Sequence, residues 1–156
     1  MNEKFMNLAL EQASIAFQQG EVPVGAVIVL DREILSMSHN RSISLHDPSG
    51  HAEILAIREA AAKLGNYRLT DTTLYVTLEP CIMCAGAIIQ ARIRKVVFGA
   101  GDPKGGGVVS LYRLLHDERL NHTVEVIGGV KSDACSEILS RFFQGKRITS
   151  NTNSQL

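Results

Sequence analysis

The stretch TLYVTLEPCIMCAGAIIQARIRKVVFGA, residues 73–100, decides the fold. Its first six residues, 73–78, are rich in β-branched and apolar side chains, and Pro80 ends that run. Residues 81–91 form an apolar segment of helical length, and residues 95–99 again favour a strand. A strand, a helix and a second strand in this order form a βαβ crossover, which predicts two parallel strands in one sheet.

The flanking sequence adds helices and strands in alternation. Apolar residues at helical spacing predict helices, and β-branched runs between turn residues predict strands. By these criteria we expect helices at residues 3–19, 51–64, 111–115 and 132–143, and strands at residues 22–30, 34–38 and 123–127. The first two of these strands are close enough in sequence to form a hairpin. Together with residues 73–100, these elements predict an α/β fold.

The length and composition are those of one globular domain. The 156 residues are 45% hydrophobic and 21% charged, and at this length folding removes roughly 70% of the extended chain's surface from water. We expect a single domain over residues 1–147 and a polar, flexible tail over residues 148–156. No basic leader is seen, and no stretch approaches the roughly 20 apolar residues of a membrane span. These features predict a soluble, cytoplasmic protein with no membrane partner.

The net charge of zero conceals an uneven distribution. Residues 1–91 hold 6 Lys and Arg against 10 Asp and Glu, whereas residues 92–156 hold 10 against 6. The basic half is suited to face a polyanion. Chance unevenness between two solvated surfaces explains the same numbers equally well, so both interpretations stay open.

Two of the three cysteines form a close pair that suits a metal site. Cys81 and Cys84 begin an expected helix, where a spacing of three residues puts both sulfurs on one face. With the imidazole of His51 they make a ligand set typical of zinc, and three protein ligands leave the fourth position of a Zn²⁺ ion open for water or hydroxide. A redox pair or half of a structural zinc knot are the alternatives, but a knot needs further ligands that Cys135 does not supply. Cys135 itself is expected to be a small buried hydrophobe.

The expected topology brings these ligands together. His51 follows the carboxyl end of the second strand and Cys81 that of the third, and if those strands are parallel neighbours both helix starts meet at one sheet edge. Glu53 lies two residues after His51, a turn of roughly 200° on a helix, so its carboxylate can address a zinc-bound water without becoming a ligand. A solvated first-turn acid is the alternative for Glu53. Glu79, the competing carboxylate, is expected to be structural.

A resemblance covers nearly the whole chain. His51-Ala52-Glu53 followed by Pro80-Cys81-Ile82-Met83-Cys84 matches the zinc deaminase signature. Over residues 3–147 the chain resembles bacterial tRNA-specific adenosine deaminases, of the cytidine deaminase-like superfamily, through these stretches: GEVPVGAVIV, HN at 39–40, NYRLTDTTLYVTLEPCIMCAGAII, ARIRKVVFGA, SLYRLLHDERLNH and RFF. The resemblance implies a three-layer α/β/α fold with a mixed sheet of about five strands.

The resemblance also implies an activity. It implies hydrolytic deamination of adenosine to inosine at the wobble position of an arginine tRNA, with one Zn²⁺ per chain and Glu53 as the proton shuttle. The anticodon stem-loop would be the RNA partner and the enzyme would be a homodimer. A free-base or nucleoside deaminase acting on guanine or cytosine is the alternative, with a pocket closed over a small molecule. A zinc-stabilised binding module is a second alternative, against which the poised Glu53 argues.

Substrate contacts are carried over position by position from the resemblance. Asn40 would bond the purine, at N7, and the Ala52 amide the base edge, while Asp102 would contact ribose or backbone. Three residues would form apolar walls: Val22, Pro23 and Leu78. Four cations are candidates for phosphate contacts: Lys104, Arg141, Lys146 and Arg147. Phe142 and Phe143 could stack on bases, at most one of them touching RNA. Gly101 stands where the family commonly has a basic residue, so no phosphate contact is expected there.

Overall fold

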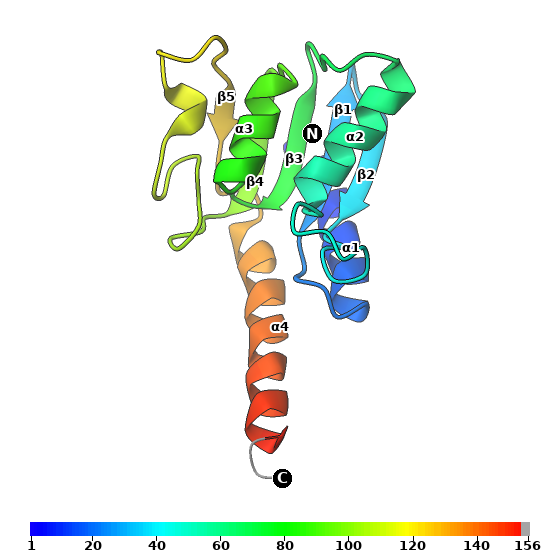
Figure 1. Ribbon diagram of the computed structural model, residues 1–156, viewed down its shortest axis with the longest axis vertical. Coiled ribbons are helices and arrows are strands. Elements are labelled where there is room, and N and C mark those ends of the chain that lie inside the picture. The colour runs from blue at the N-terminus through cyan, green and yellow to red at the C-terminus, as the bar shows by residue number, and fades with distance from the viewer. Residues whose placement is uncertain (154–156) are drawn as a thin grey trace.

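The computed structural model describes the backbone of residues 1–153 and the side chains of residues 1–147. It contains one five-stranded sheet with the order β2-β1-β3-β4-β5 (Figure 1). The helices are α1 (Asn2–Gln18), α2 (Ala52–Leu64), α3 (Ile82–Gln90), the 3-10 turn η1 (Leu114–His116) and α4 (Ser132–Asn153). The strands are β1 (Gly25–Leu30), β2 (Glu33–His39), β3 (Thr73–Leu78), β4 (Lys95–Ala100) and β5 (Glu125–Ile127).

The sheet is mixed, and its strand order sets where the loops emerge. β1 pairs antiparallel with both β2 and β3, whereas β3, β4 and β5 pair in parallel. The predicted hairpin and βαβ crossover are therefore confirmed. The expectation that the strands preceding His51 and Cys81 are neighbours is wrong, because β1 lies between β2 and β3. Two successive antiparallel pairings restore the strand direction, so β2 and β3 still end at the same edge of the sheet.

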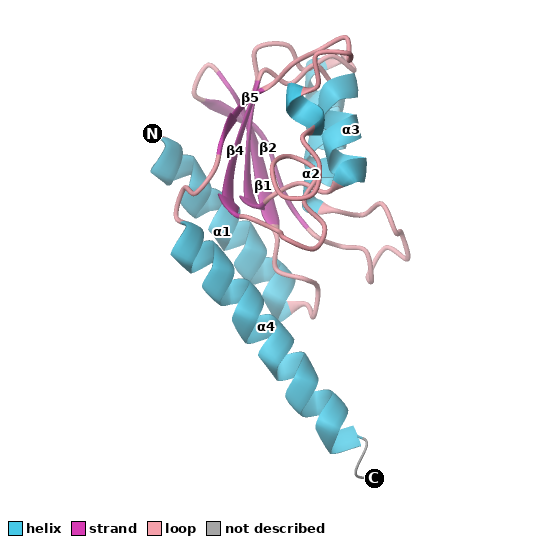
Figure 2. Cartoon of the chain, turned by 90° about the vertical axis from the view of Figure 1, so that its left-hand side faces the viewer, coloured by secondary structure: helices cyan, strands magenta, loops and turns pink. Residues whose placement is uncertain are grey.

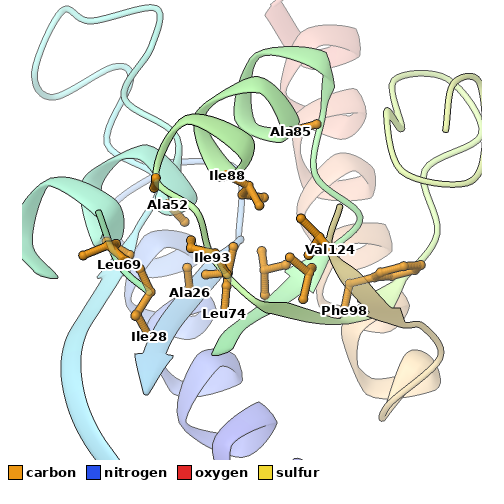
Figure 3. Packing of buried hydrophobic residues seen from close by; sticks show 14 of the residues in the cluster. Ala26, Ile28, Ala52, Leu69, Leu74, Ala85, Ile88, Ile93, Phe98 and Val124 are labelled. Atoms are coloured by element: carbon orange, nitrogen blue, oxygen red, sulfur yellow. The ribbon is translucent and has the colours of Figure 1, made fainter. Parts of the chain in front are cut away.

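Helices cover both faces of the sheet, as the three-layer prediction requires. Figure 2 shows α1 and α4 on one face and α2 and α3 on the other. Each face has its own apolar core: one contains Ala52, Ile88, Leu74 and Phe98, and the other contains Phe5, Met6, Val97 and Cys135. Figure 3 shows the first core, where Ala52 of α2 and Ala85 and Ile88 of α3 lie over the strands. The α/β/α architecture is confirmed.

Small residues bring two helices close to the sheet. Ala52, Ala56 and Ala60 form a stripe at a spacing of four on α2, and all three are fully buried. On the other face a side chain at Gly25 would place its Cβ 1.8 Å from the carbonyl oxygen of Ala9, so α1 packs directly on the β1 backbone. Close packing of this kind holds α1 and α2 near the backbone of the sheet.

Several boundaries differ from the sequence prediction. β1 begins at Gly25 rather than Val22, because the Val24 amide bonds back to the Val22 carbonyl at 2.8 Å and closes a tight turn at Pro23. α4 continues to Asn153 and extends beyond the sheet (Figure 1), although its last turns lack the apolar periodicity that would have predicted them. Residues 154–156 of the expected tail lie outside the described residues. In the described part of the chain, no helix has both the length and the apolar character of a membrane span.

Candidate active site

Two of the expected metal ligands occupy the same position on neighbouring helices. His51 is the N-cap of α2, with φ −76° and ψ 151°, and Cys81 is the N-cap of α3, with φ −75° and ψ 178°. Cys84 lies in the first turn of α3 and is fully buried. The loop after β2 and the loop after β3 thus deliver both helix starts to one edge of the sheet.

The three ligand atoms have the spacing of a tetrahedral zinc site. Nδ1 of His51 lies 3.7 Å from Sγ of Cys81 and 3.5 Å from Sγ of Cys84. All three atoms lie within 4.8 Å of one another. Tetrahedral Zn²⁺ with Zn–S near 2.3 Å and Zn–N near 2.0–2.1 Å separates nitrogen from sulfur by about 3.6 Å. The residues therefore fit a zinc ion, with Nδ1 as the imidazole ligand.

The two thiols of this site differ in acidity. A hydrogen bond from the Cys84 thiol lowers the pKa of Cys81 to about 4, which favours the thiolate form that zinc binds. The same hydrogen bond, followed by burial, raises the pKa of Cys84, because only the protonated thiol can donate it. Zinc binds both sulfurs as thiolates, so metal binding must release the proton of Cys84.

Glu53 shares the cavity of these residues without belonging to the ligand group. Its side chain is 4% exposed, and it lines a cavity of about 230 Å³ together with His51 and Cys81. Burial raises the pKa of Glu53 above its ordinary value.

The walls of this cavity come from five segments of the chain. Its other lining residues are Val22, Val24, Asn40, Ser42, Leu78, Glu79 and Asp102. Val24 and Ser42 could not be predicted as wall residues, because neither carries a chemical signal of its own in the sequence. Pro23, expected as a wall, is buried and lines neither this cavity nor the neighbouring one. Val22 and Val24, on either side of Pro23, line the first cavity instead.

Asn40 is fixed by the start of α2. The amide nitrogen of Ala52 donates a hydrogen bond of 2.7 Å to Oδ1 of Asn40. This bond orients the side-chain amide and leaves its Nδ2 group as the donor for a ligand. The Ala52 amide already donates to Asn40, so it is not free for the direct contact with a base edge that was expected. It orients the Asn40 side chain instead.

A second cavity adjoins the first. It has a volume of about 470 Å³ and shares Val22, Leu78 and Asp102 with the first cavity. Its other lining residues are Gly101, Lys104, Leu139, Phe143 and Arg147. The two cavities thus place cationic and aromatic side chains beside the candidate metal site.

The two phenylalanines of α4 differ in accessibility. Phe143 is 44% exposed and lines the second cavity, whereas Phe142 is 7% exposed. The Phe142 ring packs edge-on against Phe17 at 5.8 Å between centroids, so of the two rings Phe143 is the one accessible for stacking. Arg141 and Lys146, the other candidates for phosphate contacts, line neither cavity. Arg141 lies 5.6 Å from the centre of the Phe17 ring, and Lys146 lies 5.4 Å from the centre of the Phe142 ring.

Glu79 and Cys135 have structural roles, as predicted. Burial alone would raise the pKa of Glu79, but hydrogen bonds from Ser110 and from loop backbone amides outweigh it and bring the pKa to about 2. Cys135 is fully buried between the sheet and the helices on the opposite face. Burial raises the pKa of Cys135 to about 11, so its thiol stays protonated.

Known proteins are similar to this chain in both fold and sequence. Residues 1–147 match the family described as MafB19-like deaminase. The chain is 52% identical over 147 residues to the tRNA-specific adenosine deaminase of Haemophilus influenzae, covering 94% of this chain and 85% of that protein. A solved structure from studies of A-to-I editing by tRNA:A34 deaminases at the wobble position of transfer RNA has a TM-score of 0.85 at 48% identity, covering 87% of this chain and 99% of that one. The guanine deaminase of Bacillus subtilis has a TM-score of 0.61 at 42% identity, covering 64% of each chain.

Proposed function

Because the chain belongs to the MafB19-like deaminase family, we propose that it catalyses hydrolytic deamination of adenosine to inosine at the wobble position of a tRNA anticodon. The similarity to tRNA-specific adenosine deaminases over 94% of the chain supports this substrate. The resemblance also favours an arginine tRNA as the substrate. Such a reaction would take place in the cytoplasm.

The chemical step would use the residues of the first cavity. Zinc held by His51, Cys81 and Cys84 would supply, when bound, a water whose pKa is lowered from 15.7 toward about 7. Glu53 would carry the proton of the attacking water to purine N1 as C6 is attacked. It would then carry the hydroxyl proton to the amino group, which departs as ammonia. The burial of Glu53 supports this role, because a raised pKa suits both uptake and release of a proton.

The base would be held by the remaining walls of the first cavity. Nδ2 of Asn40 would donate to purine N7, and the Ala52 amide would act by fixing Asn40. Val22 and Leu78 would form the apolar walls on either side of the extruded base. Asp102 would contact ribose or backbone, since it lies where the two cavities meet.

One observation favours RNA over a free base as the substrate. The first cavity shares three wall residues with the second, and the second presents Lys104, Arg147 and Phe143. A free base needs no such extension, whereas a nucleotide flanking the target adenosine can stack on Phe143 and place its phosphate near the two cations. The second cavity is therefore proposed as the site of the flanking nucleotides.

A homodimer is the proposed assembly. Exposed apolar side chains at the start of α3 and on the adjoining loop supply a face for a second copy: Ile82, Met83, Val109, Leu111 and Tyr112. The backbone of Ile82 lies against Gly107 of that loop, which joins the two segments into one surface. Analytical ultracentrifugation of the wild type and of Leu111→Asp would test this assembly, with a dimer expected for the former and a monomer for the latter.

The test of the substrate is direct. A tRNA pool lacking inosine is incubated with the purified, zinc-loaded protein and sequenced, since inosine is copied as guanosine. The proposal expects A-to-G changes confined to one anticodon position, in an arginine tRNA. Absence of any change, with guanine or cytosine deaminated by the same sample, would favour the free-base alternative.

A further inference from the structure

Two buried glutamates outside the metal group each bind a loop that borders the first cavity. The first is Glu21, whose side chain is 2% exposed. Its Oε1 accepts a hydrogen bond of 2.9 Å from the Ile43 amide, and its Oε2 accepts one of 2.9 Å from the Ser44 amide. The same loop carries Asn40 and Ser42 into the cavity wall.

The second is Glu79, which is also 2% exposed. Its carboxylate accepts hydrogen bonds from four loop amides, those of Asp102, Val108, Val109 and Ser110, at 2.8–3.1 Å. The Ser110 hydroxyl donates a further bond to it. The loop is shaped around this carboxylate, because a Cβ at Gly106 would lie 2.3 Å from Oε2 of Glu79. This loop brings Asp102 to both cavities and Lys104 to the second.

Neither carboxylate forms an ion pair within the described part of the chain. Their charges are instead stabilised by backbone N–H groups directed at them, an arrangement that binds anions tightly. For Glu21 these bonds outweigh the effect of burial and lower the pKa. The partners of both glutamates are thus the loops themselves, so removal of either charge releases one loop.

We propose that Glu21 and Glu79 are positioning residues, each fixing one wall of the nucleoside-binding cavities before the substrate binds. This inference rests on the proposed function for its substrate. Glu21 fixes the wall that contacts the base, through Asn40 and Ser42. Glu79 fixes the wall that contacts ribose and the flanking RNA, through Asp102 and Lys104. Neither glutamate takes part in proton transfer, because the oxygens of both are already bonded to the loops.

The test compares Glu21→Gln and Glu79→Gln with Glu11→Gln, an exposed glutamate of α1. Each zinc-loaded protein is assayed on an anticodon stem-loop with adenosine at the wobble position. The expected result for both variants is a KM raised by roughly tenfold or more, with kcat within about threefold of the wild type and zinc content unchanged. Glu11→Gln should match the wild type. An unchanged KM, or a fall in kcat alone, would overturn the inference.

Amide hydrogen exchange gives a second, activity-independent readout. In Glu21→Gln the amides of Ile43 and Ser44 should exchange faster, and in Glu79→Gln those of Val108–Ser110, each without an effect on the other loop. Should Glu79→Gln not fold, Ser110→Ala is the milder variant: it removes the hydroxyl hydrogen bond to Glu79, keeps the amide one, and should speed exchange in the same loop. Unaltered exchange would overturn the inference. If the wild type leaves the stem-loop unchanged, the proposed function fails, and exchange alone decides the positioning roles.

Discussion

Nδ1 of His51 lies 3.7 Å from Sγ of Cys81, although the two residues are 30 positions apart in the sequence. Both are N-caps, so each is held where its helix begins. α2 is in turn pressed onto the sheet by its stripe of alanines, and α3 by Ala85 and Ile88. Helix packing therefore holds His51 and Cys81 beside each other.

Loss of a ligand should empty the metal site while the fold survives. Cys84→Ala removes a thiolate that the other two ligands cannot replace. We expect most of the zinc to be lost, together with activity, while circular dichroism keeps its helical signal. Metal analysis of the purified protein checks this. Cys135→Ala is the matched control, a buried cysteine in the other core, and should keep its zinc; equal zinc in both variants would rule out Cys84 as a ligand.

Glu53→Gln should separate catalysis from metal binding. The amide keeps the shape of the side chain but cannot carry a proton, so kcat should fall by roughly 10²–10⁴-fold with zinc retained. Single-turnover assays on the stem-loop measure the loss. Glu59→Gln, an exposed position on the same helix, should leave the rate unchanged. Full activity of the Glu53 variant in a zinc-loaded sample would refute the proton-carrier role.

The clustering of His51, Cys81 and Cys84 and much of the fold could be predicted because their signals are local. Residues 73–100 carry a complete strand, helix and strand, and the ligands stand at sequence positions where helices start. The insertion of β1 between β2 and β3 could not be predicted, because strand order depends on how distant strands pack. The role of Glu21 could not be predicted for a related reason. Its hydrogen-bond partners are backbone amides 22 and 23 residues away, and because almost any residue has such an amide, they leave no signal in the sequence.

The neighbouring residues Phe142 and Phe143 should respond to truncation in opposite ways. Phe142→Ala removes a ring packed on Phe17 and should lower the free energy of unfolding by about 3–5 kcal/mol. Phe143→Ala should change stability by less than about 0.5 kcal/mol and weaken stem-loop binding by about 1–3 kcal/mol through the lost stacking. Denaturant unfolding and equilibrium binding measure the two effects. Stem-loop binding that survives Phe143→Ala intact would remove this ring from the RNA site.

The contribution of Glu21 to stability should depend on pH. The pKa of Glu21 lies below its ordinary value of 4.5 in the folded protein, so the ionised carboxylate stabilises the fold above that value. This stabilisation should be lost as pH falls through the lower folded pKa. His39 adds a further favourable charge when it is protonated.

Thermal unfolding of the wild type and Glu21→Gln at several pH values measures this effect. The difference in Tm should be full at pH 7 and shrink steadily below about pH 4.5. Glu33→Gln, on the exposed side of β2, serves as the control and should show little difference at either pH. A Tm difference for Glu21→Gln that stays constant down to pH 2 would show that its charge is not what holds the loop.

A comparison of two substrates tests most directly whether the site formed by His51, Cys81 and Cys84 acts on adenosine in RNA. One zinc-loaded preparation is divided between an anticodon stem-loop with a wobble adenosine and free guanine at equal concentration, and both products are quantified by mass spectrometry. We expect the kcat/KM for inosine formation from the stem-loop to be far above the kcat/KM for xanthine formation from guanine. Faster turnover of guanine than of the stem-loop would contradict it.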